Sequence, residues 1–384
     1  MKKHIKLLVV LGIILVGSFS FYLFKGYKKD ALVYENNKIM PSSSGIAMML
    51  ETSAGSGNYE MTTRSEWPTE GYVFNANLSK CENGSELSWD NENKKVLMSG
   101  NKSDKCYVYF DVYVKPTIAN TCSSGTNLAT CIKTFGDKGS SVSNIYHHDA
   151  SLTNEAEDNS YRFAGASDQV NNYVCFGSSE ASCPTDNLYR IIGVFGDKVK
   201  LIKSTSVGTK AWDSDDSNTW STSSLNTYLN NEFINAFDET TKGKIAETTW
   251  KVGGNTYNNI AKQPAKTAYQ NEINSSPSEN KKIGLMYASD YGFAAVPSAW
   301  TTNLCDYNGA AIKSANWMYL GAYEWTISRN AGYSNFAFIV NGTGYVAGGG
   351  NVTNAGGFRP VFSLSSFVNY ASGSGSATDP ILVN

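Results

Sequence analysis

The sequence predicts an α+β C-terminal domain with an antiparallel sheet and one or two helices, preceded by a small all-β sandwich and an N-terminal transmembrane helix. Three observations predict this order. Residues 7–24 are uncharged, as in a membrane-spanning helix. In residues 106–114, Tyr and Asp alternate with Val and Phe at the period of a β-strand. Residues 220–237 place apolar side chains at helical spacing. One or two helices ahead of a strand-rich stretch favour separate helices and sheets over alternating β-α-β units.

The first residues are typical of a membrane-spanning segment. Residues 1–6 are basic, residues 7–24 (LLVVLGIILVGSFSFYLF) carry no charge, and lysines follow. An apolar run of about 18 residues is just long enough to cross a bilayer as a helix. We expect an uncleaved anchor over residues 1–29. The alternative is a secretory signal peptide that is cut after Gly17 or Ser20.

The cysteines indicate the compartment. Seven are present, and six form locally spaced pairs amid Ser, Gly and Asn. Such pairs predict disulfides in an oxidising compartment, whereas a zinc site would need CxxC spacing or histidine partners. The expected disulfides are Cys81–Cys106, Cys122–Cys131 and Cys175–Cys183, with Cys305 left over. We therefore expect a single-pass protein of the cell membrane with most of its chain outside the cell.

The composition argues against one class of partner. The net charge is -2, whereas a protein that binds nucleic acid needs a basic surface to contact phosphates. The chain is rich in Tyr, Gly, Ser, Asn and Thr, which suit strands and turns and are also frequent in adaptable recognition surfaces. These features favour a binding protein without a nucleic-acid partner.

Four segments follow the anchor. Residues 30–45 are expected to form a spacer, and residues 46–115 the small β-sandwich, stapled by a disulfide. Residues 116–160 read as a loop-rich, disulfide-containing connector, and residues 161–384 as the main domain. In the sandwich, alternation over residues 106–114 predicts one buried face and one aromatic outer face.

The main domain shows a clear order of elements. A hairpin is predicted around Gly196, then a helix over residues 220–237, and a second short helix that begins at an Asp238 cap. A further hairpin turns at Gly342, where Asn-Gly is a strong turn dipeptide. The apolar stretch 357–368 is predicted to be the last core strand.

Three stretches of this domain resemble a domain of unknown function (DUF6273-like) that is common in anchored proteins of gut Firmicutes and Tenericutes. The stretches are NTWSTSSLNTYLNNEFINAF at 218–237, EWTISRNAGYSNFAFIVNGTGYV at 324–346 and NAGGFRPVFSL at 354–364. A more distant similarity is to formylglycine-generating-enzyme-like and C-type-lectin-like domains, which also end on a Gly-Phe-Arg strand. This resemblance implies a C-type-lectin-like scaffold that displays a loop surface for ligands.

The sequence departs from the active members of both distant families. The formylglycine-generating enzyme uses a cysteine pair near its C-terminus, but here only Cys305 follows Cys183. The calcium-binding motifs of sugar-binding C-type lectins are absent as well. We therefore expect no enzyme activity, no metal and no cofactor.

Other catalytic residues are weakly indicated. His147 and His148 are adjacent in the predicted connector, and adjacent residues cannot share one face of a strand, so a solvated loop is favoured over a metal site. Carboxylates that could serve a glycosidase have no spacing that would bring two of them together. They are Glu232, Asp238, Glu247 and Glu324.

Residues 316–356 are the expected ligand surface, because aromatic and amide side chains suit polar recognition. Its proposed binding residues are Asn316, Tyr319, Tyr323, Tyr333, Asn335, Asn351 and Asn354. Structural roles are expected for Arg359, as the partner of a core carboxylate, and for Trp220, Trp317 and Trp325. The predicted function is a non-catalytic, membrane-anchored surface protein that binds an unknown glycan or protein. The alternative is an envelope-associated enzyme that acts on glycans.

Overall fold

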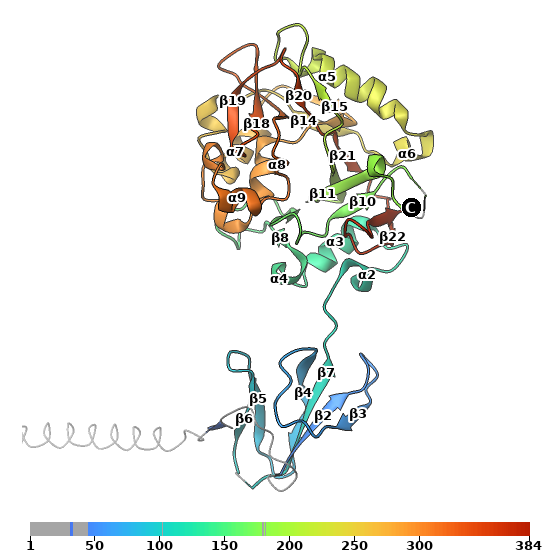
Figure 1. Cartoon of the computed structure of the whole chain (residues 1–384), viewed down its shortest axis with the longest axis vertical. Coiled ribbons are helices and arrows are strands. Elements are labelled where there is room, and N and C mark those ends of the chain that lie inside the picture. Colours follow the sequence, from blue (N-terminus) through green and yellow to red (C-terminus); the bar gives the residue numbers. More distant parts are fainter. Residues whose placement is uncertain (1–30, 34–44, 102, 179, 181) are drawn as a thin grey trace, which may run out of the picture. The chain divides into compact units, whose positions relative to one another are not determined.

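The computed structural model of the chain describes residues 31–33 and 45–384, apart from residues 102, 179 and 181. The chain divides into two compact units (Figure 1). Unit 1 is Met1–Lys115 and unit 2 is Pro116–Asn384.

The predicted transmembrane helix is not supported, and the fold class is corrected accordingly. Within the described ranges, no helix combines the length and the apolar character that crossing a bilayer requires. Residues 7–24, on which that prediction rested, lie outside the described residues.

Unit 1 is built from strands in two sheets. The larger sheet has the order β3-β2-β7-β4 and the smaller has β1-β6-β5. β2 and β7 run parallel, and the remaining neighbours are antiparallel. The strands are β1 (Ala31–Val33), β2 (Ile46–Glu51), β3 (Tyr59–Met61), β4 (Tyr72–Cys81), β5 (Glu86–Asp90), β6 (Lys95–Ser99) and β7 (Cys106–Val112).

The two sheets of unit 1 share one core. Val96 of β6 is buried in the same cluster as Val108 and Phe110 of β7. The rings of Trp89 and Phe110 meet edge to face at 5.5 Å. Tyr107 lies on the outer face, as the alternation predicted. Residues 46–112 therefore form a small sandwich.

Unit 2 contains two large sheets and a small one. The largest has the order β16-β21-β12-β11-β10-β23-β22, with β9 on β11 and β8 on β9; the second has β13-β20-β17-β18-β19, and β14 pairs with β15. Its strands are β8 (Ile145–His147), β9 (Tyr161–Phe163), β10 (Tyr173–Cys175), β11 (Leu188–Phe195), β12 (Lys198–Lys203), β13 (Thr209–Lys210), β14 (Thr248–Lys251), β15 (Ser278–Lys281), β16 (Ile283–Gly284), β17 (Glu324–Arg329), β18 (Phe336–Val340), β19 (Val346–Asn351), β20 (Gly356–Gly357), β21 (Val361–Leu364), β22 (Tyr370–Ser372) and β23 (Ile381–Val383).

The helices of unit 2 are short and more numerous than the one or two that were predicted. The α-helices are α2 (Ile118–Thr121), α3 (Leu128–Gly136), α4 (Ser140–Ser143), α5 (Ser224–Thr227), α6 (Glu239–Lys244), α7 (Ala265–Ile273), α8 (Ala288–Phe293) and α9 (Ala310–Ser314). Other helical turns are η3 (Thr185–Asn187), η4 (Trp220–Thr222), η5 (Tyr228–Phe233), η6 (Ile234–Ala236), η7 (Tyr257–Asn259), η8 (Pro297–Ala299) and η9 (Leu304–Asp306).

Two sequence predictions for unit 2 differ in detail from the structure. The helix over residues 220–237 is interrupted, because the α-helical turn capped by Ser223 changes to the π-helical η5. The sheets are not purely antiparallel, since β10 runs parallel to β23 and β17 to β20. The hairpin at Gly196 and the Asp238 cap are present.

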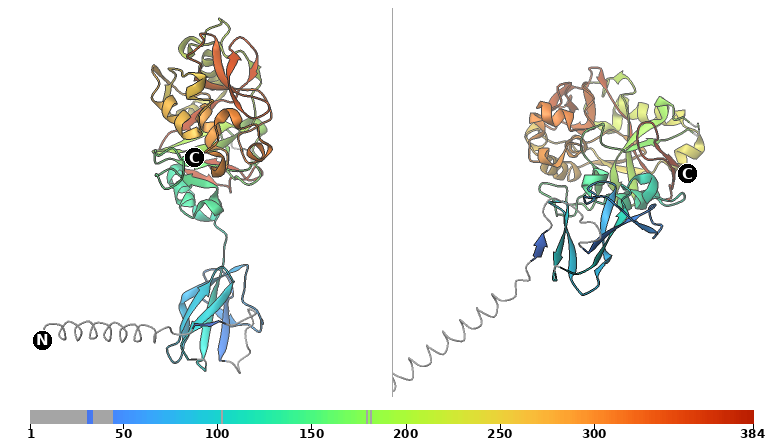
Figure 2. Two further views of the ribbon diagram at one scale, coloured as in Figure 1. Left: turned by 90° about the vertical axis from the view of Figure 1, so that its left-hand side faces the viewer. Right: turned by 60° about the horizontal axis from the view of Figure 1, so that its bottom comes forward.

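The segment predicted as a connector is part of unit 2. Asn127 caps the N-terminus of helix α3. The helix is amphipathic, and its buried face includes Leu128, Ile132 and Phe135. These side chains join the same core as the large sheet. In both views of Figure 2, the teal segment with α2, α3 and α4 lies against the body of unit 2. An apolar helical face of this size must be covered by a neighbour, so residues 116–160 belong to the domain.

Candidate functional site

An open cavity of about 430 Å³ lies in the second sheet region of unit 2. It forms where β20 pairs antiparallel with β13 and parallel with the start of β17. The lining residues are Ser206, Gly208, Thr209, Leu320, Ala322, Tyr323, Glu324, Ala355, Gly356 and Gly357. The volume falls in the usual range for small-molecule sites, which makes this cavity the candidate site.

Two glycines allow strand β20 to pack closely against Trp325 and the backbone of Tyr323. A Cβ on Gly356 would lie 2.5 Å from Nε1 of Trp325, and one on Gly357 would lie 2.8 Å from the carbonyl oxygen of Tyr323. Both separations are shorter than real Cβ contacts. A stretch of the cavity wall is therefore backbone without side chains, in which the amide of Gly357 donates to the carbonyl of Tyr323 within the sheet.

Tyr323 is the one sequence-predicted binding residue that lines the cavity. Its ring packs edge to face on Trp325, with centroids 5.5 Å apart. Burial raises the pKa of Tyr323 to about 12, so the phenol is neutral at physiological pH. Trp325 is fully buried and donates from Nε1 to the carbonyl of Lys210 at 3.0 Å, which ties β17 to β13.

Glu324 and Arg359 form a buried pair at the cavity. Nε of Arg359 donates to Oε1 of Glu324 at 2.5 Å, and Nη2 donates to Oε2 at 2.9 Å. Nη2 also donates to the carbonyl of Met318 at 2.8 Å. Arg359 is 1% exposed and Glu324 is 3% exposed. Glu324 is thus the core carboxylate that pairs with Arg359, and both of its oxygens accept from the guanidinium.

The match to a known family covers this site. Residues 196–366 match the family described as Domain of unknown function (DUF6273). Every residue that lines the cavity falls within those limits. Neither the curated proteins nor the solved structures gave a match to this chain.

Within the DUF6273 region, Asn316 is a core residue where a binding residue was predicted, and Trp317 is a core residue as predicted. Asn316 is buried and donates from Nδ2 to the carbonyl of Tyr291 at 3.0 Å, while its side-chain oxygen Oδ1 accepts from the amide of Met318. Trp317 is buried and donates from Nε1 to the carbonyl of Phe163 at 2.8 Å. Asn316 therefore holds the loop and is not displayed to a ligand.

The remaining predicted binding residues lie outside the cavity lining. Tyr319 donates its hydroxyl to the carbonyl of Gly342. Tyr333 is 61% exposed, and Asn335 donates to Asp216. Asn351 accepts from the amide of Thr353, and Asn354 is exposed beside Ala355. The structure thus does not bring the predicted set together as one site.

Sequence reasoning missed most of the cavity. Ser206, Thr209 and Leu320 come from segments outside the predicted loop surface or carry no distinctive chemistry. The signal that could have located the site is the pair Gly356-Gly357, two residues before Arg359, because glycines in a strand mark a close approach of backbone. Trp220 is fully buried, as expected, with its ring 5.1 Å from that of Trp212.

The three predicted disulfides are confirmed. Cys81–Cys106 joins β4 to β7, Cys122–Cys131 joins α2 to α3, and Cys175–Cys183 closes the loop after β10. Cys305 is the free thiol of the chain. Burial raises the pKa of Cys305, with Asp306 adding to the effect, which makes the thiol a poor nucleophile.

The histidines and carboxylates that the sequence offered as metal ligands or catalytic groups do not come together as a site. His147 stacks on Tyr161, whereas His148 is buried and accepts from the amide of Ala156 at Nδ1. Asp238 accepts from the amide of Thr241 as a helix cap, while Glu232 and Glu247 are exposed. Across the part of the chain that the structure describes, no group of three or more His, Cys, Asp or Glu could hold a metal ion.

A second buried carboxylate holds the start of α8. Glu272 of α7 is 2% exposed and accepts from the amides of Ala288 and Ser289 and from the hydroxyl of Ser328. Burial raises the pKa of Glu272 to about 7, and the nearby Asp290 adds to the rise. Burial lowers the pKa of His148 to about 3.

These two groups predict opposing pH effects on stability. The pKa of Glu272 is raised above its unfolded value, so its stabilising contribution is present below about pH 4.5 and is lost as the pH rises through about 7. The pKa of His148 is depressed, so its contribution is present above about pH 6.5 and falls as the pH drops toward 3. Between about pH 4.5 and 6.5 the two slopes should largely cancel.

Glu272→Gln should remove the contribution of Glu272 to the pH dependence of the unfolding free energy. We expect the variant to lose more of its unfolding free energy than the wild type between about pH 6.5 and 4.5, because the opposing contribution of Glu272 no longer offsets that of His148. Urea unfolding at a series of pH values measures the difference. The same curve for both proteins would show that Glu272 does not titrate in this window.

Proposed function

We propose that unit 2 is a non-catalytic binding domain whose cavity takes a small uncharged polar ligand, with a short neutral glycan as the class that fits best. The observation that carries the proposal is the open cavity of about 430 Å³ beside β20. Cavities of this size, with mostly apolar walls and a few polar groups, are the usual form of a small-molecule site.

The lining favours a neutral ligand. Glu324 is its one carboxylate, and Arg359 already satisfies both oxygens of that group. The lining has no lysine, arginine or histidine side chain. Leu320, Ala322 and Tyr323 supply apolar surface, and the polar side-chain groups of the lining other than Glu324 are the hydroxyls of Ser206, Thr209 and Tyr323. A sugar presents this same mixture of apolar faces and hydroxyls.

The same lining speaks against cleavage of the bound glycan. Hydrolysis of a glycosidic bond ordinarily needs two carboxyl groups that flank the bond. Glu324 is paired with Arg359, and no second carboxylate lines the cavity. Binding without cleavage is therefore the simpler function for this geometry.

The disulfides support a site of action outside the reducing cytosol. Three cysteine pairs are bonded, at positions spread over both units. Bonds of this kind form and persist mainly in secreted proteins and at cell surfaces. A lectin-like role in such a compartment is consistent with the distant resemblance of the Gly357-Phe358-Arg359 ending to C-type-lectin-like domains.

Filling the cavity should abolish binding. Ala322 is exposed and lines the cavity, so Ala322→Trp should fill it without disturbing the core. On an array of neutral glycans, we expect the wild-type chain to bind and the variant to lose at least about tenfold in affinity. The matched control is Ala311→Trp, because Ala311 is also an exposed alanine and lies on α9 outside the cavity lining.

Tyr333→Ala separates this site from the surface that the sequence predicted. Tyr333 is exposed and does not line the cavity, so its loss should leave binding unchanged. If Tyr333→Ala abolishes binding while Ala322→Trp does not, the ligand binds at the loop surface and the cavity is the wrong site.

A further inference from the structure

In unit 1, strand β2 is only partly covered by its neighbour β3. β3 pairs with Met49, Leu50 and Glu51, which are the second half of β2. Beyond them, the amide of Thr62 donates to the carbonyl of Met48, and the chain then leaves the sheet. The first residues of β2 therefore have no strand beside them on this side among the residues that the structure describes.

The ladder on the other side of β2 determines which backbone groups point to that free edge. The Cys106 amide of β7 donates to the carbonyl of Gly45, while Ile46 lies directly opposite Cys106 in the parallel register. In a parallel ladder, alternate residues of a strand bond to opposite sides. The N–H and C=O of Ile46 therefore point away from β7, toward the edge that β3 leaves open.

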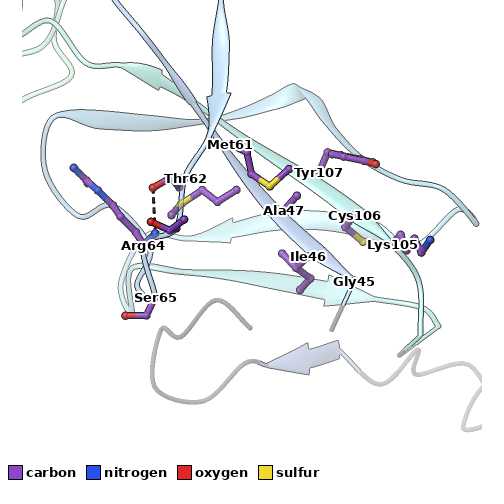
Figure 3. Close-up of a pocket in the computed structure, with 12 residues that line it drawn as sticks. Gly45, Ile46, Ala47, Met61, Thr62, Arg64, Ser65, Lys105, Cys106 and Tyr107 are labelled. Atoms are coloured by element: carbon purple, nitrogen blue, oxygen red, sulfur yellow. Dashed lines mark hydrogen bonds between the residues drawn. The ribbon is translucent and has the colours of Figure 1, made fainter. Parts of the chain in front are cut away.

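A groove of about 490 Å³ runs along this edge. Figure 3 shows the side chains of Ala47, Met61 and Tyr107 around its centre. Met61 is 64% exposed and Tyr107 is 36% exposed, so both present apolar surface to solvent. A strand that added to β2 here would gain backbone hydrogen bonds and apolar contacts together.

The groove is basic. Its lining includes Arg64 and Lys105 and no acidic residue. Both side chains are exposed, and Figure 3 shows them on opposite sides of Ala47 and Met61. Charge complementarity therefore favours an occupant with an apolar centre and an acidic residue toward each end.

We propose that this groove is a peptide-binding site, which takes an extended segment of a protein partner as an added β-strand on β2. The segment carries apolar side chains at its centre, against Met61 and Tyr107, and acidic side chains that face Arg64 and Lys105. The site is independent of the cavity in unit 2.

The test uses a blocked peptide with a valine-rich centre and glutamate at both ends, titrated into the full chain by calorimetry. We expect it to bind, and we expect the same peptide with lysine at both ends to bind at least about tenfold more weakly. N-methylation on alternate residues distinguishes strand addition from simple charge attraction. One methylation pattern should abolish binding and the other should not, because only alternate amides of an added strand face β2.

Substitutions on the protein locate the binding site. Arg64→Glu combined with Lys105→Glu should weaken binding of the acidic peptide at least about tenfold and strengthen binding of the lysine peptide. Lys94→Glu, on the turn between β5 and β6, is the control and should have little effect. The proposal is overturned if the acidic peptide does not bind, if both methylation patterns act alike, or if Lys94→Glu matches the double variant.

Discussion

Arg359→Ala should lower the free energy of unfolding by about 3–5 kcal/mol, which is a large share of the 5–15 kcal/mol typical of a domain. The guanidinium donates to both oxygens of Glu324 and to the carbonyl of Met318, and all of these groups are buried. Removing it leaves a buried carboxylate without a counter-charge. The loss therefore comes mainly from the unpaired Glu324 and less from the pair itself.

Chemical denaturation of the full chain measures this effect, with Arg64→Ala as the matched control. Arg64 is exposed, so the same substitution there should change stability by no more than about 0.5 kcal/mol. Arg359→Met with Glu324→Gln should recover part of the loss, since no buried charge is then left over. If Arg359→Ala unfolds like the wild type but no longer binds a ligand, the arginine belongs to the binding site and its structural role is wrong.

Local features were predictable from the sequence. The spacing of the cysteines gave the three disulfides, and the alternation in β7 correctly placed Val108 and Phe110 in the core. The turn at Gly196 and the Asp238 cap were also predicted correctly. Each of these signals depends on residues close together in the chain.

The composition of the site was not predictable, because it depends on contacts between distant segments. Asn316 is of a residue type that is frequent in binding surfaces, yet its side-chain amide donates to the carbonyl of Tyr291 in the core. An arginine in an apolar strand indicates a buried partner, but only the fold brings Glu324 to Arg359. The cavity itself is formed by three segments that are distant in the sequence, and of these only the Gly356-Gly357 pair carries a local signal.

The connector prediction failed because polarity in a sequence does not exclude packing. The stretch between His148 and Ser160 is rich in acidic and small residues, yet Glu155 and His148 are fully buried. Positive φ angles at Ala150, Asn154 and Glu157 fold this loop tightly against the unit. Sequence composition shows that such a segment is polar, but not that Glu155 and His148 are buried and accept hydrogen bonds from the amides of Leu152 and Ala156.

A chain that begins at Ser160 should therefore fail to fold, whereas one that begins at Pro116 should fold as a unit. Starting at Ser160 removes Leu128, Ile132 and Phe135 from the core of the large sheet, together with strand β8. Burial of each such side chain is worth about 1.5–3 kcal/mol, so losing three removes about as much as the whole stability of an ordinary domain.

Near-ultraviolet circular dichroism and urea unfolding of the two shortened chains measure the difference. We expect a cooperative transition for the chain from Pro116, because the contacts of unit 2 lie within it. For the chain from Ser160 we expect no fixed aromatic signal, since Phe163, Trp300 and their neighbours lose the helix-bearing segment that covers them. Equal transitions in both chains would show that residues 116–159 only connect the units, as the sequence alone indicated. The buried face of α3 makes that result unexpected.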